Sequence, residues 1–262
     1  MTTCGATFNL STENTKAKIP TSWLNQHYFC FIKFKGSKMA DDNGDLQALE
    51  ILLNEFFALG TAPTRQREIE EILLGFGSQQ GAWSHCLRFL SRSSNHFVSM
   101  FCLTTIETVI QRKWQVLPWQ EKIEIKTSLY NFALQHHRSM PPFLRNKLVK
   151  LIVDIARHDW PHFYPDFMSN IIELIQTPEH TALGLVFART ASEELGASRE
   201  DLSSARRDEL RRLLLAQVPQ LFSALTGLLE KLLSCQKHKA TSTPPPSPTH
   251  GQPETNSESA AS

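Results

Sequence analysis

The residues that could most readily take part in catalysis or bind a metal are histidines next to a cysteine or to another histidine. His85 precedes Cys86, an order that would suit a Cys–His pair in nucleophilic catalysis. Cys86 lies in an apolar helical run, however, which predicts a buried thiol instead. His136 and His137 form a doublet, but adjacent helical residues point in different directions and no acid or cysteine stands at ligand spacing. We interpret the doublet as a solvated helix end.

Recognised catalytic motifs are missing from the sequence. It contains no glycine-rich phosphate loop, no nucleophile elbow and no His-Glu-x-x-His pattern. The five cysteines are scattered without a Cys-x-x-Cys pair, and we interpret Cys86 and Cys102 as reduced core thiols, which points to the cytosol or nucleus. The sequence therefore predicts a protein that is not an enzyme and holds no cofactor and no metal.

Charged residues gather in two places. Glu68, Glu70 and Glu71 form an acidic group among arginines, and Arg206-Arg207 with Arg211-Arg212 form the strongest basic patch. Opposite charges alternate around both groups, which is typical of a solvated helix face with i,i+4 pairs. A phosphate or nucleic-acid site at the arginines is the alternative.

Bulk properties favour neither nucleic acid nor membrane as a partner. The formal net charge is +1, so no global electrostatic attraction to either follows. No run approaches the ~18 apolar residues that a membrane span needs. We therefore expect no nucleic-acid partner and no membrane insertion.

Apolar residues recur at helical spacing from residue 45 to about residue 235. The expected helices are 45–59, 64–77, 82–92, 95–114, 118–137, 141–158, 161–177, 181–196 and 203–235. The breaks coincide with Gly60, Pro63, Gly81, Asn95, Pro118, Pro141-Pro142, Pro161 and Pro178. These helices pair at about 40 residues, the period of HEAT-type repeats, whose pairs must stack to bury their apolar stripes. The sequence therefore predicts an all-α HEAT-repeat α-solenoid of about four to five helical pairs.

Residues 143–167 predict a sharp corner between two helices. The apolar stripe of the first helix consists of Leu144, Leu148, Leu151, Ile152 and Ile155, and its opposite, polar side carries Asn146, Lys147, Lys150, Asp154 and Arg157. We expect the chain to restart at once as a second helix, with Asp159 in an N-cap region and Pro161 in the first turn. The expected structural residues are Trp160 and Pro161 at this corner, with Trp83 and Trp114 elsewhere in the core.

The two ends of the chain differ in composition from the helical region 41–235. Residues 1–40 are rich in Ser and Thr, and residues 236–262 are rich in Pro and Ser, so we expect both to be disordered tails. Met39 looks like an ordinary start, which leaves open whether residues 1–38 belong to the native protein. Thr243 and Ser247 each precede proline and fit proline-directed phosphorylation, although a plain linker fits equally well.

Several strings, taken in order, resemble the N-terminal region of the importin-β/exportin superfamily. They are Ile106–Ile110 followed by Trp114–Pro118, then Asn146-Lys147-Leu148, then Asp159-Trp160-Pro161 with Pro165 and Phe167. Further strings resemble one member of the superfamily, which carries actin with profilin out of the nucleus. These are Gly81-Ala82-Trp83, Cys86-Leu87, Phe89-Leu90, Ser192–Leu195, Arg199–Ser203 and the Thr-Pro-Pro-Pro-Ser-Pro-Thr run that begins at Thr243. The resemblance covers about residues 41–250.

This resemblance implies a HEAT-repeat export receptor that shuttles between nucleus and cytoplasm. Such receptors bind Ran-GTP through the inner helices of their N-terminal repeats and also bind a protein cargo, here actin with profilin; nuclear pore components are further partners that it allows. The GTPase chemistry belongs to Ran. On inner helices we expect the partner-binding residues to be Lys147, Lys150, Asp154 and Arg157, with Arg65, Arg67, Arg112 and Lys113 as weaker candidates.

Two alternatives stand beside this hypothesis. Each of these side chains fits a merely solvated helix face, and the whole chain fits a helical-repeat scaffold with no dependence on Ran. Superfamily members are also several times longer than this chain. The last expected helices would then leave an apolar end face open, which predicts marginal solubility unless another segment covers it.

Overall fold

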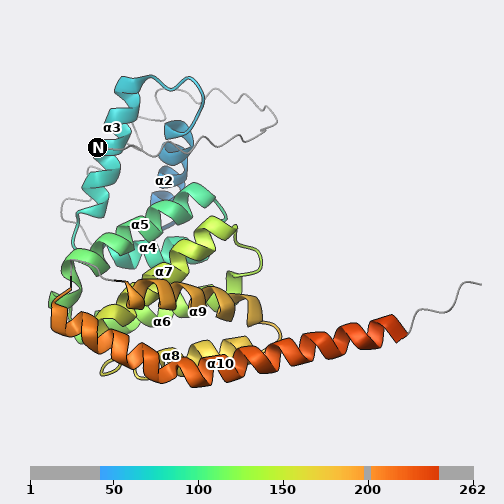
Figure 1. Ribbon diagram of the computed structural model, residues 1–262. Helices are drawn as coiled ribbons and strands as arrows, with labels where there is room; N and C mark the ends of the chain where they lie inside the picture. Colours follow the sequence, from blue (N-terminus) through green and yellow to red (C-terminus); the bar gives the residue numbers. More distant parts are fainter. Residues whose placement is uncertain (1–41, 198–201, 242–262) are drawn as a thin grey trace, which may run out of the picture. The chain divides into compact units, whose positions relative to one another are not determined.

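The computed structural model describes residues 42–197 and 202–241, and these form α-helices, one 3-10 helix and no β-strand (Figure 1). The helices are α2 (Asp42–Phe56), α3 (Pro63–Gly77), α4 (Ala82–Arg92), α5 (His96–Lys113), η1 (Trp114–Val116), α6 (Trp119–His136), α7 (Pro142–Asp159), α8 (Phe167–Gln176), α9 (Thr181–Gly196) and α10 (Ser204–Thr241). The predicted all-α, HEAT-like helical fold is confirmed.

Local sequence signals set most helix ends. Pro63 occupies the first turn of α3, where its missing N–H leaves no hydrogen bond unmade. Gly81 supplies the positive φ of 80° that the turn before α4 requires. Asn95 caps α5, and its side-chain oxygen accepts the N–H of Phe97 at 2.9 Å. These ends therefore fall within a residue or two of their predicted positions.

The chain divides inside α7 into two compact units, the first ending at Ile155 and the second beginning at Ala156. In unit 1, α4 packs on α5 and α6, and α2 packs on α3 and α5. In unit 2, α8 packs on α9, and both contact α10. Each unit has its own apolar core, with Leu49, Ile69, Phe89, Ile106 and Trp114 in unit 1 and with Phe167, Phe187, Leu195 and Leu210 in unit 2.

Hydrogen bonds in unit 1 reproduce the predicted repeat of about 40 residues. The Ser93 hydroxyl donates to Glu50 at 2.5 Å across 43 residues, and the Asn95 amide donates to Asn54 at 3.1 Å across 41 residues. Lys147 donates to Glu107 at 2.7 Å across 40 residues. Side chains one period apart therefore meet.

The predicted corner after α7 is wrong in its detail. Helix α7 ends at Asp159, as expected, but residues 160–166 form turns and α8 begins only at Phe167. Asp159 is a buried residue of α7 instead of an N-cap, and Pro161 is half-buried outside any helix. A helix starting at Pro161 would have to pass through Pro165, whose ring would clash with the carbonyl four residues earlier. The Trp160–Pro161 peptide bond is cis.

The last described helix departs from prediction in two ways. Helix α10 continues to Thr241, beyond the predicted boundary at residue 235. By length and composition alone, its segment Ser204–Gln236 could cross a membrane, so the expectation that no segment reaches this limit was too strict. One such helix is weak evidence for a span, since core helices of soluble proteins meet the same criterion. The two expected tails, with Thr243 and Ser247, lie almost wholly outside the described residues.

A candidate partner-binding surface

Lys147 forms an ion pair that joins two of the expected inner helices. Its Nζ lies 2.7 Å from Glu107 Oε2, so the pair links α7 to α5 within unit 1. Both side chains are about one-fifth exposed, at 20% and 21%. A partner carboxylate would have to compete with Glu107 for this lysine.

The rest of the expected binding stripe on α7 is mostly buried, which corrects the prediction of a polar, exposed side. Asp154 is 2% exposed and Arg157 is 4% exposed. Lys150 Nζ lies 2.6 Å from Asp154 Oδ2, so the half-buried lysine neutralises the buried carboxylate. Asp154 and Arg157 therefore act inside the fold and are not available to a partner on this surface.

Arg65 also serves the fold. Its Nε and Nη2 donate to the two carboxylate oxygens of Glu55 at 2.8 and 3.1 Å, and Nη1 donates to Glu68 at 2.9 Å. The hydrogen bonds to Glu55 raise the pKa of Arg65 above its ordinary value, burial opposes this effect, and Glu68 adds to it. This two-pronged pair ties α3 to the end of α2, so Arg65 is not a free cation.

Three of the expected basic residues remain open to solvent. Arg67 on α3 and Arg112 and Lys113 at the end of α5 are exposed. Within residues 42–197 and 202–241, none of the three forms an ion pair. Among the predicted site residues, these are the ones that can meet an acidic partner without breaking an internal contact.

The three predicted core tryptophans are buried, whereas Pro161 is only half-buried, and one prediction about the histidines is wrong. Trp83, Trp114 and Trp160 are buried, and Cys86 and Cys102 are buried free thiols. A hydrogen bond with Cys86, together with burial, raises the pKa of the Cys102 thiol. The His136–His137 doublet is not a solvated helix end, because the His137 side chain is buried. In the described part of the chain, no three His, Cys, Asp or Glu residues are placed to hold a metal ion.

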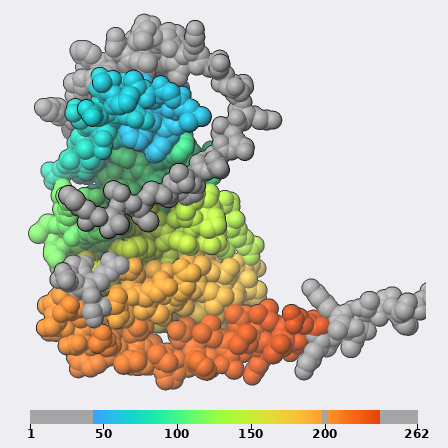
Figure 2. Space-filling model, turned by 45° about the horizontal axis from the view of Figure 1, so that its top comes forward, coloured from blue at the N-terminus to red at the C-terminus, as the bar shows by residue number. Residues whose placement is uncertain are grey.

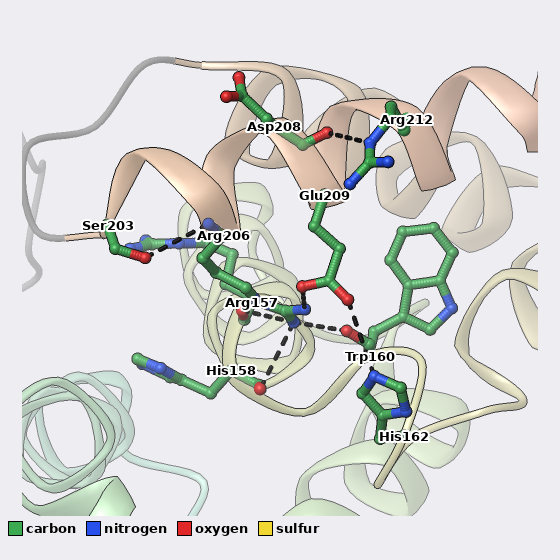
Figure 3. Close-up of polar contacts among 9 residues, drawn as sticks. All are labelled: Arg157, His158, Trp160, His162, Ser203, Arg206, Asp208, Glu209 and Arg212. Carbon is green, nitrogen blue, oxygen red and sulfur yellow. Dashed lines mark hydrogen bonds and ion pairs between the residues drawn. The ribbon is translucent and has the colours of Figure 1, made fainter.

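Sequence reasoning missed the role of Arg206, shown in Figure 3. From the first turn of α10, its Nε donates to the carbonyl of Arg157 at 3.1 Å. Its Nη2 donates to the carbonyls of Arg157 at 2.9 Å, of His158 at 3.4 Å and of Trp160. These carbonyls belong to the end of α7 and the residue after it, where a helix leaves acceptors unpaired and its dipole favours a cation. Arg206 is therefore a helix cap in unit 2, not the centre of a phosphate site.

Glu209 completes this cap and makes it sensitive to acid. Arg206 Nη1 donates to Glu209 Oε2 at 2.7 Å, and His162 Nε2 lies 3.7 Å from Oε1 of the same carboxylate. The hydrogen bond from Arg206 holds the pKa of Glu209 below its ordinary value. A carboxylate with a lowered pKa in the folded state stabilises the protein above its unfolded pKa, about 4.3 for Glu, and this stabilisation is lost as the pH falls through the folded value.

We therefore expect the substitution Glu209→Gln to make the melting temperature less dependent on pH in the acid range. The wild-type melting temperature should fall more steeply below about pH 4.5 than that of the variant. The difference is small, because the carboxylate is largely solvated. Thermal melts followed by circular dichroism across this range measure it, with Glu230→Gln, an exposed site on the same helix, as control. Parallel profiles for wild type and Glu209→Gln would contradict the prediction.

Sequence reasoning also missed exposed aromatic residues at the ends of the helices. Phe57, just after α2, stacks on Phe97 with ring centroids 4.4 Å apart and planes 15° apart. Phe143 meets His96 edge-on at 6.5 Å. All three phenylalanines are exposed. Helical spacing cannot identify them, because Phe97 follows the same apolar pattern as the buried residues of α5.

Two sequence families match consecutive parts of this chain. The Importin-beta N-terminal domain matches residues 69–135, which run from within α3 to the end of α6. The Exportin 1-like protein family matches residues 141–245, which begin just before α7 and include α10.

Individual relatives give the same result. The chain is 52% identical to Exportin-6-A of Xenopus laevis over 212 residues, which cover 80% of this chain and 18% of that protein. It is 51% identical to human Exportin-6 over 215 residues, covering 82% of this chain and 19% of the relative. It is 48% identical to Exportin-6 of Danio rerio over 212 residues, 80% of this chain and 19% of the relative. The chain thus spans less than a fifth of the length of these relatives.

The resemblance found in the sequence is thereby confirmed, including the particular member, exportin-6, that the further strings indicated. Both family matches fall on helices whose order and period follow the HEAT-like pattern. The chain belongs to the importin-β/exportin superfamily, and the relatives described above, to which it is similar, are exportin-6 proteins.

Proposed function

We propose that this chain is the Ran-GTP-binding, N-terminal part of a nuclear export receptor that shuttles between nucleus and cytoplasm. The observation that carries the proposal is the match of residues 69–135 to the Importin-beta N-terminal domain. Its cargo is a protein, actin with profilin by resemblance to exportin-6, and nuclear pore components are transient partners. The chain contributes binding energy, and the hydrolysis of GTP belongs to Ran.

The contacts on unit 1 divide the candidate residues by role. Arg67, Arg112 and Lys113 are the proposed contact residues, because they are exposed basic side chains without an internal ion pair. Lys147 and Lys150 are half-buried, and their ion pairs with Glu107 and Asp154 hold polar side chains of α7 in place. Arg65 and Asp154 support the helices of unit 1 from inside, and Arg157 is buried in unit 2.

The proposal predicts binding that depends on the nucleotide held by Ran. Isothermal titration calorimetry should detect binding of Ran loaded with a slowly hydrolysed GTP analogue. The dissociation constant for Ran-GDP should be at least ten times higher. A micromolar dissociation constant is expected for these 262 residues, since linked patches along a longer receptor would raise the affinity by ~10²–10⁴. Equal affinity for both forms, or no heat with either, would favour the helical scaffold without Ran dependence.

Charge-reversal variants in the same titration test whether Arg112 and Lys113 contact Ran-GTP. Arg112→Glu with Lys113→Glu should weaken Ran-GTP binding about tenfold, since two exposed attractive charges become repulsive. The melting temperature should fall only slightly, because the two exposed cations stand in the last turn of α5, where the helix dipole favours positive charge. Lys231→Glu, an exposed reversal on α10, is the matched control and should bind as wild type. Unchanged affinity in the double variant would remove both residues from the contact.

A test of Lys147 needs a different set of variants, because Lys147 forms an internal ion pair with Glu107. Lys147→Glu would place two carboxylates side by side, so weaker binding alone could reflect a disturbed fold. The swap Lys147→Glu with Glu107→Lys restores the ion pair between α5 and α7. If Lys147 touches Ran, the swap variant regains stability but not affinity. Recovery of both would assign the lysine to the fold alone.

A further inference from the structure

The corner where α5 passes through η1 into α6 carries two large apolar side chains that the fold leaves in solvent. Val116 is 81% exposed and Trp119 is 47% exposed. Two residues lie between them in the sequence, so their Cα atoms are at most about 11 Å apart. Figure 1 shows this corner, and Figure 2 shows green atoms from this part of the chain at the surface of unit 1. We name Val116 and Trp119 the apolar corner.

Basic side chains flank the apolar corner on both sides in the sequence. Arg112 and Lys113 immediately precede η1 and are exposed. Lys122 and Lys126 follow in the first turns of α6, and Lys126 Nζ lies 6.0 Å from the ring centroid of Trp119. The segment from the first to the last of these residues holds four cations and two acids. The corner is therefore locally basic, although the chain as a whole is nearly neutral.

The fold gains little from the exposed surface of Trp119. The residue opens α6 directly after Pro118, and almost half of its surface meets solvent instead of the core. The ammonium group of Lys126 over the ring favours one orientation of the indole. An aromatic side chain that is already held in place loses less conformational entropy when a partner covers it. Aromatic and arginine side chains also dominate the binding energy of protein interfaces.

We propose that Val116 and Trp119 are the apolar anchor of the Ran-GTP contact, with Arg112 and Lys113 as its charged rim. The inference rests on the proposed function and adds the surface chemistry of the partner, which is an apolar patch bordered by carboxylates. An apolar centre within a polar, solvated rim is the usual composition of a protein–protein interface. The anchor should slow dissociation, whereas the rim should speed association.

Single-stranded nucleic acid is the other ligand that exposed aromatic and basic side chains bind. It needs a basic groove that follows several nucleotides of backbone. Glu121 and Glu124 interrupt the basic residues within the first two turns of α6. A short basic rim beside an apolar centre therefore favours a protein surface.

Isothermal titration calorimetry of the full 262-residue chain with Ran loaded with a slowly hydrolysed GTP analogue tests this inference. The serine variant, Val116→Ser with Trp119→Ser, should raise the dissociation constant at least tenfold. The loss should be the same in about 50 mM and about 300 mM salt, because salt does not screen the burial of apolar surface. The loss caused by reversing the charges of Arg112 and Lys113 should instead shrink as the salt concentration rises.

Two control variants, with the same circular dichroism as wild type, test the specificity of the effect. Val116→Ile with Trp119→Phe keeps the corner apolar and should bind within about threefold of wild type. Leu59→Ser removes a fully exposed apolar side chain of unit 1 and should bind as wild type. Leu59 closely follows Phe57, which stacks on Phe97 at the start of α5, whereas the apolar corner lies at the other end of this helix, about 27 Å away.

The outcomes separate this inference from the proposed function. GTP-selective binding by wild type that is unchanged in the serine variant overturns the anchor and leaves the proposed function standing. A loss that disappears at high salt also overturns the anchor, because the effect is then electrostatic. Equal affinity of wild type for Ran-GTP and Ran-GDP, or no binding, overturns both. Binding of a labelled oligothymidine that the serine variant abolishes, with Ran-GTP affinity unchanged, assigns the corner to nucleic acid.

Discussion

Gly184→Ala should destabilise unit 2 by about 3 kcal/mol. A Cβ atom at Gly184 of α9 would lie 2.6 Å from the backbone nitrogen of Ile175 and 2.8 Å from the backbone carbon of Leu174. Because both atoms belong to the backbone of α8, no side-chain rotation relieves the clash, and the two helices must separate. The gain in helix propensity from Gly to Ala, about 1 kcal/mol, does not offset this.

Urea denaturation followed by tryptophan fluorescence measures the effect. Trp160 is the one tryptophan in the sequence from Ala156 onwards, so it supplies the part of the emission that reports on unit 2, beside that of the four tryptophans before it. Gly227→Ala is the matched control, since no atom lies within 4 Å of a Cβ built there. It makes the same substitution in a helix of the same unit and should stabilise by up to about 1 kcal/mol. Equal unfolding midpoints for the two variants would show that α8 and α9 adapt without cost.

The sequence predicts where the helices lie, because the two signals that define a helix, its apolar period and the residues at its ends, are both local. The apolar period identifies each helix, and Gly, Pro and Asn mark its ends, as Gly81 and Asn95 show on either side of α4. The repeat period followed from the same signals. The start of α8 was not predicted, because it depends on two prolines together. Pro161 alone suits a first helical turn, and only Pro165, four residues later, prevents it.

The candidate site was harder to predict, because burial depends on residues far along the chain. A helical wheel places Lys147, Asp154 and Arg157 on one polar side of α7. It cannot show that most residues from Leu148 to Arg157 are buried, or that the partner of Lys147 is Glu107, 40 residues earlier. Arg206 was assigned to a solvated face for the same reason, since the carbonyls that it caps lie almost 50 residues away, at separations of 46 to 49.

Trp160→Ala should lower the free energy of unfolding by about 3–5 kcal/mol. The side chain is 3% exposed, and its ring centroid lies 6.2 Å from that of Phe167 at the start of α8. Tyr164 closes the same cluster, with its ring 5.4 Å from that of Phe167. Removing the indole leaves a cavity beside these rings. The backbone carbonyl of residue 160 remains, so the variant can keep its hydrogen bond from Arg206, and the loss reports on packing.

Trp119→Ala separates this packing role from a general effect of losing an indole. Trp119 is 47% exposed, and its ring contact is Lys126, whose Nζ lies 6.0 Å away. Its removal should cost about 1 kcal/mol or less. Urea denaturation followed by circular dichroism compares the two variants, since Trp160→Ala removes the fluorescent probe of unit 2. If Trp160→Ala instead left the unfolding free energy unchanged and weakened binding to Ran-GTP, the indole would be a partner contact. Its burial against Phe167 argues for the core, because a binding residue must reach solvent before its partner arrives.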